Sequence, residues 1–152
     1  MSENVRYAEE KDIEECVALG TKMIREGIYK HFDIDLDDMR AHARRAMWGD
    51  LYCYLVFEKD GKVVGFFLAE IEKTFFGRDW VAHQNLMYID PEHRGNLKIP
   101  MEFMRWFRRW VDGETHARKM FFAPTVSVHE GFDIMAKRLG YDYVGPMYGR
   151  TP

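Results

Sequence analysis

The sequence has too few cysteines and too little net charge for several common classes of protein. Its two cysteines, Cys16 and Cys53, lack the spacing of a metal site and are too few for a disulfide-stabilised secreted scaffold. We expect both to be reduced packing residues in a cytoplasmic protein that holds no metal. The formal net charge of −3 provides no whole-protein attraction to nucleic acid or to anionic lipid, so neither is an expected partner.

Long apolar runs, internal repeats and linkers are also missing from the sequence. No apolar stretch approaches the roughly 18 residues of a membrane-spanning helix. The segment MSENVRYAEEKD lacks the apolar centre of a signal peptide. Hydrophobic residues make up 47% of the chain and charged residues 31%, which is the balance of a soluble globular protein. We therefore expect residues 1–152 to form a single domain.

The patterns that are present alternate between helix and strand. The clearest is a hairpin, because Asp60 followed by Gly61 is a strong turn signal between two arms of β-branched and aromatic residues. In chain order we expect a strand over 4–8, helices over 11–25 and 35–48, strands over 51–58, 62–72 and 81–89, a helix from about residue 100, a strand over 119–123, a helix over 131–139 and a strand over 141–148. The sequence therefore predicts an α/β domain of order β-α-α-β-β-β-α-β-α-β.

Residues 80–111 contain the strongest indication of a binding site. A strand stopped by Asp90 and Pro91 leads through a polar turn into a helix with Pro100 in its first turn. Free backbone N–H groups and the positive end of the helix dipole meet at such a junction, and Arg94 and Lys98 add positive charge. The junction predicts an anion site, for which we infer a diphosphate. An ordinary strand–helix connection with solvated basic residues is the alternative.

The run IDPEHRG, residues 89–95, followed by an amphipathic helix resembles the acyl-CoA-binding segment of the GCN5-related N-acetyltransferases (GNATs). In the family's loop pattern, Gln/Arg-x-x-Gly-x-Gly/Ala, Arg94 matches the first position, whereas Leu97 and Ile99 replace the two glycines. The order of elements and the ending RLGY, residues 138–141, are also similar to the family. The loop FFGRDW, residues 75–80, resembles a phage and bacterial subgroup. The resemblance implies a mixed, mostly antiparallel sheet that splays between its fourth and fifth strands and is flanked by helices.

The resemblance also implies an enzyme that transfers an acetyl group from acetyl-CoA to a primary amine by direct attack. The family's oxyanion donor is a backbone N–H, and its position falls near residues 87–89. The diphosphate would bind the N–H groups of the loop, and His129 stands where an asparagine commonly follows the fifth strand. The expected contacts with acetyl-CoA are Met87, Tyr88, Ile89, Arg94, Gly95, Asn96, Leu97, Lys98, Ile99 and His129.

The candidate catalytic bases lie on the two strands before the loop. His83 is one, because imidazole exchanges protons near neutral pH. Glu70 and Glu72 share one strand face and are the others. A satisfied surface histidine and a solvated hairpin face are the alternatives. The family's tyrosine acid falls on Ala136, but a thiolate is already a fair leaving group, since thiols have a pKa of about 8.5.

Loop aromatics and a histidine are the candidate walls of an acceptor pocket, although the aromatic rings could equally fold into the core. They are Tyr29, His31, Phe32, Phe75 and Phe76. The expected acceptor is a small-molecule or peptide amine, and the family commonly forms homodimers. Two other functions stay open. One is a catalytically silent GNAT-fold protein that binds a partner or assembles, which Leu97, Ile99 and Ala136 favour. The other is a phage enzyme that acylates a modified nucleobase.

Overall fold

The computed structural model describes residues 4–113, 117–122 and 132–142. Within these residues one sheet has the strand order β1-β2-β3-β4-β5, and all neighbours are antiparallel except β4 and β5. The strands are β1 Val5–Tyr7, β2 Tyr52–Lys59, β3 Lys62–Lys73, β4 Trp80–Ile89 and β5 Ala117–Phe122. The mixed, mostly antiparallel sheet expected from the sequence is therefore confirmed.

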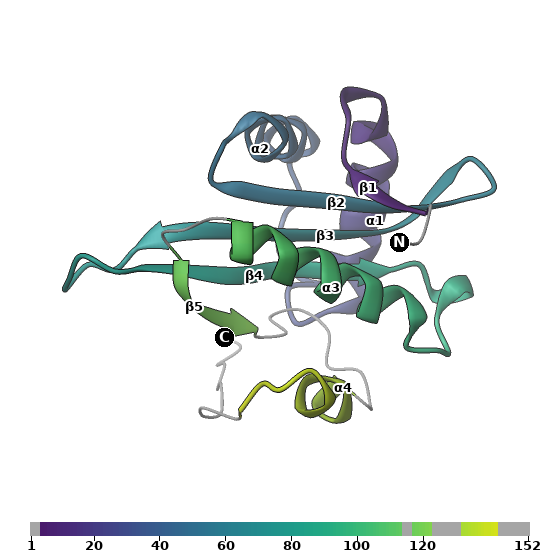
Figure 1. Ribbon diagram of the computed structural model, residues 1–152. Coiled ribbons are helices and arrows are strands. Elements are labelled where there is room, and N and C mark those ends of the chain that lie inside the picture. The colour runs from purple at the N-terminus through teal and green to yellow at the C-terminus, as the bar shows by residue number, and fades with distance from the viewer. Residues whose placement is uncertain (1–3, 114–116, 123–131, 143–152) are drawn as a thin grey trace.

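Helices cover both faces of this sheet. In Figure 1, α3 crosses the front of the sheet and α1 and α2 lie behind it. The helices are α1 Ile13–Glu26, α2 Leu36–Trp48, α3 Lys98–Gly113 and α4 Phe132–Arg138, with 3-10 turns η1 Glu10–Asp12 and η2 Pro91–His93. Each lies within a few residues of its predicted range. The expected last strand over 141–148 falls almost wholly outside the described residues. No helix in the described ranges has both the length and the apolar character needed to span a membrane.

Local sequence signals explain where these elements turn and begin. Asp60 and Gly61 connect β2 to β3 with φ angles of 52° and 75°, the left-handed pair that a two-residue hairpin requires. Asp35 caps α2 because its side chain accepts hydrogen bonds from the N–H groups of Asp37 and Asp38. These signals are local, which is why the element boundaries could be read from the sequence.

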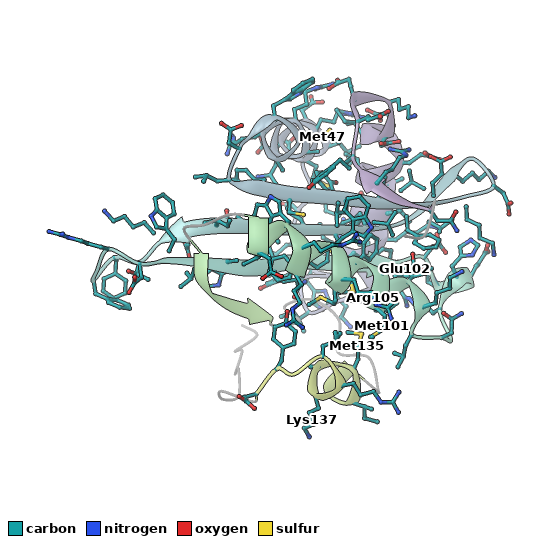
Figure 2. The ribbon with its side chains drawn as sticks, viewed as in Figure 1. Met47, Met101, Glu102, Arg105, Met135 and Lys137 are labelled. Carbon is teal, nitrogen blue, oxygen red and sulfur yellow. The ribbon has the colours of Figure 1, made fainter. Side chains whose placement is uncertain are left out.

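The α3 face of the sheet is closely packed with aromatic rings. Phe67 of β3 stacks on Phe103 of α3 at 5.8 Å between ring centroids and lies 5.4 Å from Phe107. All three side chains are fully buried. Helix α4 extends this core, because Met135 is buried in it and Met101 of α3 packs alongside, as Figure 2 shows between the two helices. Burial of this face supplies much of the hydrophobic stabilisation.

The opposite face packs against α1 and α2 and forms a second core. The strand residues Val56, Phe66 and Leu68 meet Cys16 and Met23 of α1 there. The two helices approach closely at Gly20, where an added Cβ would lie 2.8 Å from the Cε atom of Met39. Glycine therefore allows the two helices to sit side by side over the sheet.

Candidate active site

Among the described residues, β4 has two strand neighbours along only half of its length. Residues 80–84 pair with β3 on one side and with β5 on the other. From residue 85 to residue 89 the strand pairs only with β3 among the described residues. The pairing ends where the described part of β5 ends, at Phe122, and a splay is expected between these two strands at this place.

A β-bulge marks the point where the pairing changes. Leu68 of β3 faces Leu86, whereas the next residue, Ala69, faces Gln84, so Asn85 is the extra residue. The Asn85 amide donates a hydrogen bond of 2.8 Å to the Glu70 carboxylate. The bulge thus turns a polar side chain toward the α1/α2 face of the sheet.

The three candidate bases lie together beside this bulge. His83 stands directly opposite Glu70 in the strand register, and its Nε2 atom is 2.9 Å from Oε1 of Glu72. We call Glu70, Glu72, His83 and Asn85 the β3–β4 polar cluster. Its members are partly exposed and sit beyond the apolar part of the α1/α2 face. An imidazole next to a carboxylate can take up a proton and hold the resulting charge.

The β4–α3 loop, residues 90–97, presents backbone donors at the start of α3. Gly95 has φ 108°, as expected for the one glycine of this turn. The Asn96 side chain accepts a hydrogen bond from the Lys98 N–H at 2.9 Å. Within the described part of the chain, the N–H groups of Gly95, Asn96 and Leu97 have no acceptor. Together with the helix dipole they form an anion-binding arrangement.

The two residues that replace the family's glycines do not obstruct this loop. Neither Leu97 nor Ile99 has a positive φ. Leu97 is 37% exposed, and Ile99 is buried in the core beneath α3. The loop therefore keeps its free N–H groups without the backbone freedom of glycine at these two positions.

Arg94 is directed away from the loop donors. Its guanidinium donates to the Ile89 carbonyl at 2.7 Å and to Glu26 of α1 at 2.9 Å, and it lies 5.0 Å from the centre of the Tyr88 ring. Glu26 also accepts a 2.6 Å hydrogen bond from the Tyr88 hydroxyl. Burial, followed by this bond, raises the pKa of Tyr88, so the phenol stays protonated. Arg94 thus fixes the loop against α1.

The remaining cations near the loop are differently placed. Lys22 of α1 pairs with Asp90 at 2.6 Å, which lowers the pKa of Asp90 and ties the start of the loop to α1. Lys98 is exposed and makes no ion pair within the described residues. It also lines a cavity of about 340 Å³ beside the loop, together with His93 and Asn96. Lys98 is therefore the side chain best placed to meet an anion at the loop.

A larger cavity of about 610 Å³ lies between α1, α2 and the sheet. Its walls include Met23, Met39, Phe66, Leu68 and Leu86; Asp38, His42 and Arg45 of α2 also line it, as do the tyrosines Tyr29 and Tyr54. The apolar residues recur at helical and strand periods, a pattern that in sequence indicates a filled core. The sequence therefore gave no signal that this space is open.

Only one of the predicted acceptor-pocket residues lines the larger cavity. Tyr29 does, and Phe32 packs edge-on against Tyr29 at 5.5 Å; His31 lies beside them and is exposed. Phe75 and Phe76 are 98% and 78% exposed at the end of the β3–β4 hairpin, which projects to the left in Figure 1. His129 lies outside the described residues. Ala136 is half-buried on α4.

Sequence reasoning missed Asn85 as a site residue. The available signal was the polar run His83, Gln84 and Asn85 inside an otherwise apolar strand. Gln84 points to the α3 side, where it is buried, so only two of the three reach the polar cluster. No group of three or more histidine, cysteine, aspartate or glutamate side chains in the described ranges could hold a metal ion.

The chain is similar to known proteins in structure but not in sequence. No sequence-family model and no curated protein sequence matches the chain. An aminoglycoside N-acetyltransferase solved with CoA is 14% identical, with a TM-score of 0.74 and coverage of 98% of this chain and 93% of that one. A glucosamine-6-phosphate N-acetyltransferase from Arabidopsis thaliana is 13% identical, with a TM-score of 0.72 and coverage of 97% and 96%. A possible acetyltransferase from Clostridium difficile 630 is 15% identical, with a TM-score of 0.71 and coverage of 97% and 96%. The chain has the GNAT fold.

Proposed function

We propose that this GNAT-fold chain is an enzyme that transfers an acetyl group from acetyl-CoA to a primary amine. The observation that carries the proposal is the loop between β4 and α3, where three backbone N–H groups at the start of α3 have no acceptor among the described residues. Such a loop suits the diphosphate of CoA, and the part of β4 beyond its pairing with β5 would lie along the pantetheine arm. Both are parts of the same ligand. The comparison structures solved with CoA support this choice.

The loop residues would bind the diphosphate through backbone more than through side chains. The N–H groups of Gly95, Asn96 and Leu97 are the donors, and Lys98 adds a full positive charge. Arg94 would act indirectly, because its bonds to Ile89 and Glu26 hold the loop in the binding conformation. Because the backbone N–H groups and Lys98 would bind the diphosphate, the proposed site does not require glycine at position 97.

In the proposed reaction, β4 would polarise the thioester carbonyl and the polar cluster would accept a proton. Acetyl-CoA supplies the acyl group as a thioester, whose carbonyl a β4 backbone N–H near residues 87–89 would polarise. The amine nitrogen forms a bond to the carbonyl carbon, and the bond from that carbon to sulfur breaks. His83, supported by Glu72, is the candidate that takes the proton released by the amine, directly or through water; Glu70 is the alternative.

Two substitutions of Leu97 in the loop test whether CoA binds there. Leu97→Asp would place a carboxylate beside the diphosphate, and two unit charges about 4 Å apart repel by roughly 1–4 kcal/mol at an effective dielectric between 80 and 20. We expect acetyl-CoA affinity, measured by calorimetry, to fall between roughly fivefold and several hundredfold. Leu97→Asn, similar in size but neutral, is the matched control and should bind nearly as well as the wild type.

Folding should survive both substitutions, because Leu97 is exposed at a helix N-terminus where acidic residues are tolerated. Acetyl-CoA at about 100 times its dissociation constant should stabilise the wild type by roughly 2.7 kcal/mol. A wild type that shows neither heat of binding nor stabilisation with millimolar acetyl-CoA would overturn the proposal and favour a silent domain.

A further inference from the structure

Resting on the acetyl transfer proposed above, we propose that the acceptor is a primary amine carried on an apolar body. The body would occupy the cavity between α1, α2 and the sheet, and the amino group would lie at the β3–β4 polar cluster. The observations behind this assignment are the size of the cavity, the chemistry of its walls and its position next to the cluster.

The cavity has the size and the lining of a small-molecule site. Its volume of about 610 Å³ falls within the roughly 300–1,000 Å³ typical of ligand pockets. Two methionines, Met23 and Met39, line it, and their flexible side chains adapt to ligands of different shape. Cys16 is another wall residue, and burial raises the pKa of its thiol to about 11. The thiol is thus a neutral part of an apolar surface.

The sheet residues that line the cavity are next to the polar cluster on the same two strands. Leu68 and Leu86 face each other across β3 and β4 and both line the cavity. Leu86 follows the bulge residue Asn85, and Leu68 lies two residues before Glu70 on the same face of β3. Residues two apart in a strand are separated by about 7 Å. A ligand body on the two leucines would therefore place an attached amine among the cluster side chains.

The charged groups around the cavity fit a ligand whose amine lies at the polar cluster. The cluster contains two carboxylates, and neither Glu70 nor Glu72 pairs with a lysine or arginine in the described part of the chain. The charged side chains and the histidine of the cavity, by contrast, are exposed residues of α2, and the buried walls are apolar apart from the Tyr54 hydroxyl. A sugar or polyamine body would find few hydrogen-bond partners on these walls, and each polar group that lost its hydration without a partner would weaken binding. An ammonium group with an apolar tail avoids this cost.

An amine panel tests the assignment with acetyl-CoA as donor and release of free thiol as readout. The apolar probes are 2-phenylethylamine and hexylamine, and the polar probes are glucosamine and spermidine. We expect kcat/KM for the apolar amines to exceed that for the polar ones by roughly 10–200-fold, the discrimination that apolar pockets provide. Equal or faster turnover of glucosamine or spermidine would overturn the inference while leaving the proposed acetyl transfer intact.

A cavity-filling variant locates the binding site. Met39→Trp should lower kcat/KM for 2-phenylethylamine by about tenfold or more and leave acetyl-CoA affinity unchanged, because Met39 lines the cavity from α2 and belongs neither to the loop nor to β4. Leu51→Trp is the matched control, because Leu51 is 46% exposed and does not line the cavity. If Met39→Trp unfolds, Ala41→Trp fills the same space from α2, where Ala41 is exposed. Full activity of a folded, cavity-filled variant would contradict the assignment. Failure of acetyl-CoA to bind the wild type would instead overturn the proposed function itself.

Discussion

The two faces of the sheet are both apolar, but they are held together in different ways. On the α3 side, Phe67, Phe103 and Phe107 stack directly on one another and are fully buried. On the α1/α2 side, the same sheet borders a cavity of about 610 Å³. No ion pair in the described chain involves α3, whereas ion pairs from α1, α2 and η1 run along the other side.

The difference indicates how a domain of this size can contain such a cavity without losing its fold. Close packing of α3 and the sheet provides the rigid part. On the cavity side, polar bonds add to the packing of the second core: Arg40 joins α2 to Glu14 of α1 at 2.8 Å, and Arg94 joins the loop to Glu26 at 2.9 Å. Exposed pairs of this kind each contribute little free energy, roughly 0–1 kcal/mol. Their geometric effect is to fix where the helices lie.

The largest expected effect on the cavity side is on catalysis. His83→Gln should lower acetyl transfer by roughly 10²–10⁴-fold, with acetyl-CoA affinity and the free energy of unfolding nearly unchanged. Glu72→Gln should lower it less, because the imidazole remains and only its 2.9 Å partner is neutralised. Steady-state kinetics and calorimetry on each variant separate the two effects. Turnover of His83→Gln within roughly threefold of the wild type would shift the role of base to Glu70.

A matched pair of methionines compares the packing of the two faces. Met104 of α3 is 1% exposed, whereas Met39 of α2 is half-buried at the cavity. Met104→Ala should cost about 2–5 kcal/mol of unfolding free energy, because it opens a void in a closely packed region. Met39→Ala should cost about 1 kcal/mol or less, since its side chain already borders open space. Denaturation with urea measures both, and equal losses would mean that the two faces are packed alike.

The next expected effect concerns an ion pair whose carboxylate is buried. Asp12 is 2% exposed and accepts hydrogen bonds of 2.6 and 2.9 Å from Arg6. Burial alone would raise the pKa of Asp12, but the bonds from Arg6 and from the Glu9 N–H outweigh it and lower the pKa below its usual 3.8. Asp12→Asn should cost about 1–3 kcal/mol at pH 7.

The pH dependence of that cost gives a second check on Asp12. Because its pKa is lowered in the folded state, the ionised carboxylate stabilises the protein fully above the unfolded pKa. That stabilisation disappears as the pH falls below about 4 and through the folded pKa. The difference in unfolding free energy between the wild type and Asp12→Asn should therefore shrink in acid. If the difference in unfolding free energy stays constant from pH 7 to pH 3, Asp12→Asn destabilises the protein through lost packing and not through the lost charge.

The sequence predicted the elements and the loop better than it predicted the site. Helix and strand periods and the Asp60 turn are local signals, so the element order and Gly95 followed from them. The bulge at Asn85 depends on how β3 and β4 align, which no local pattern specifies. The direction of Arg94 depends on Glu26, which is 68 residues away in the chain. The cavity is a property of packing between helices, which period and composition do not encode.

The most direct test of the proposed N-acetyl transfer is to identify the product of one reaction by mass spectrometry. The protein, acetyl-CoA and 2-phenylethylamine are incubated together, with heat-denatured protein as the blank. We expect N-acetylated amine and an equal amount of free CoA, both reduced in Leu97→Asp and in His83→Gln. If folded wild type binds acetyl-CoA but transfers no acetyl group to this or any other primary amine of the panel, the central claim of N-acetyl transfer is contradicted.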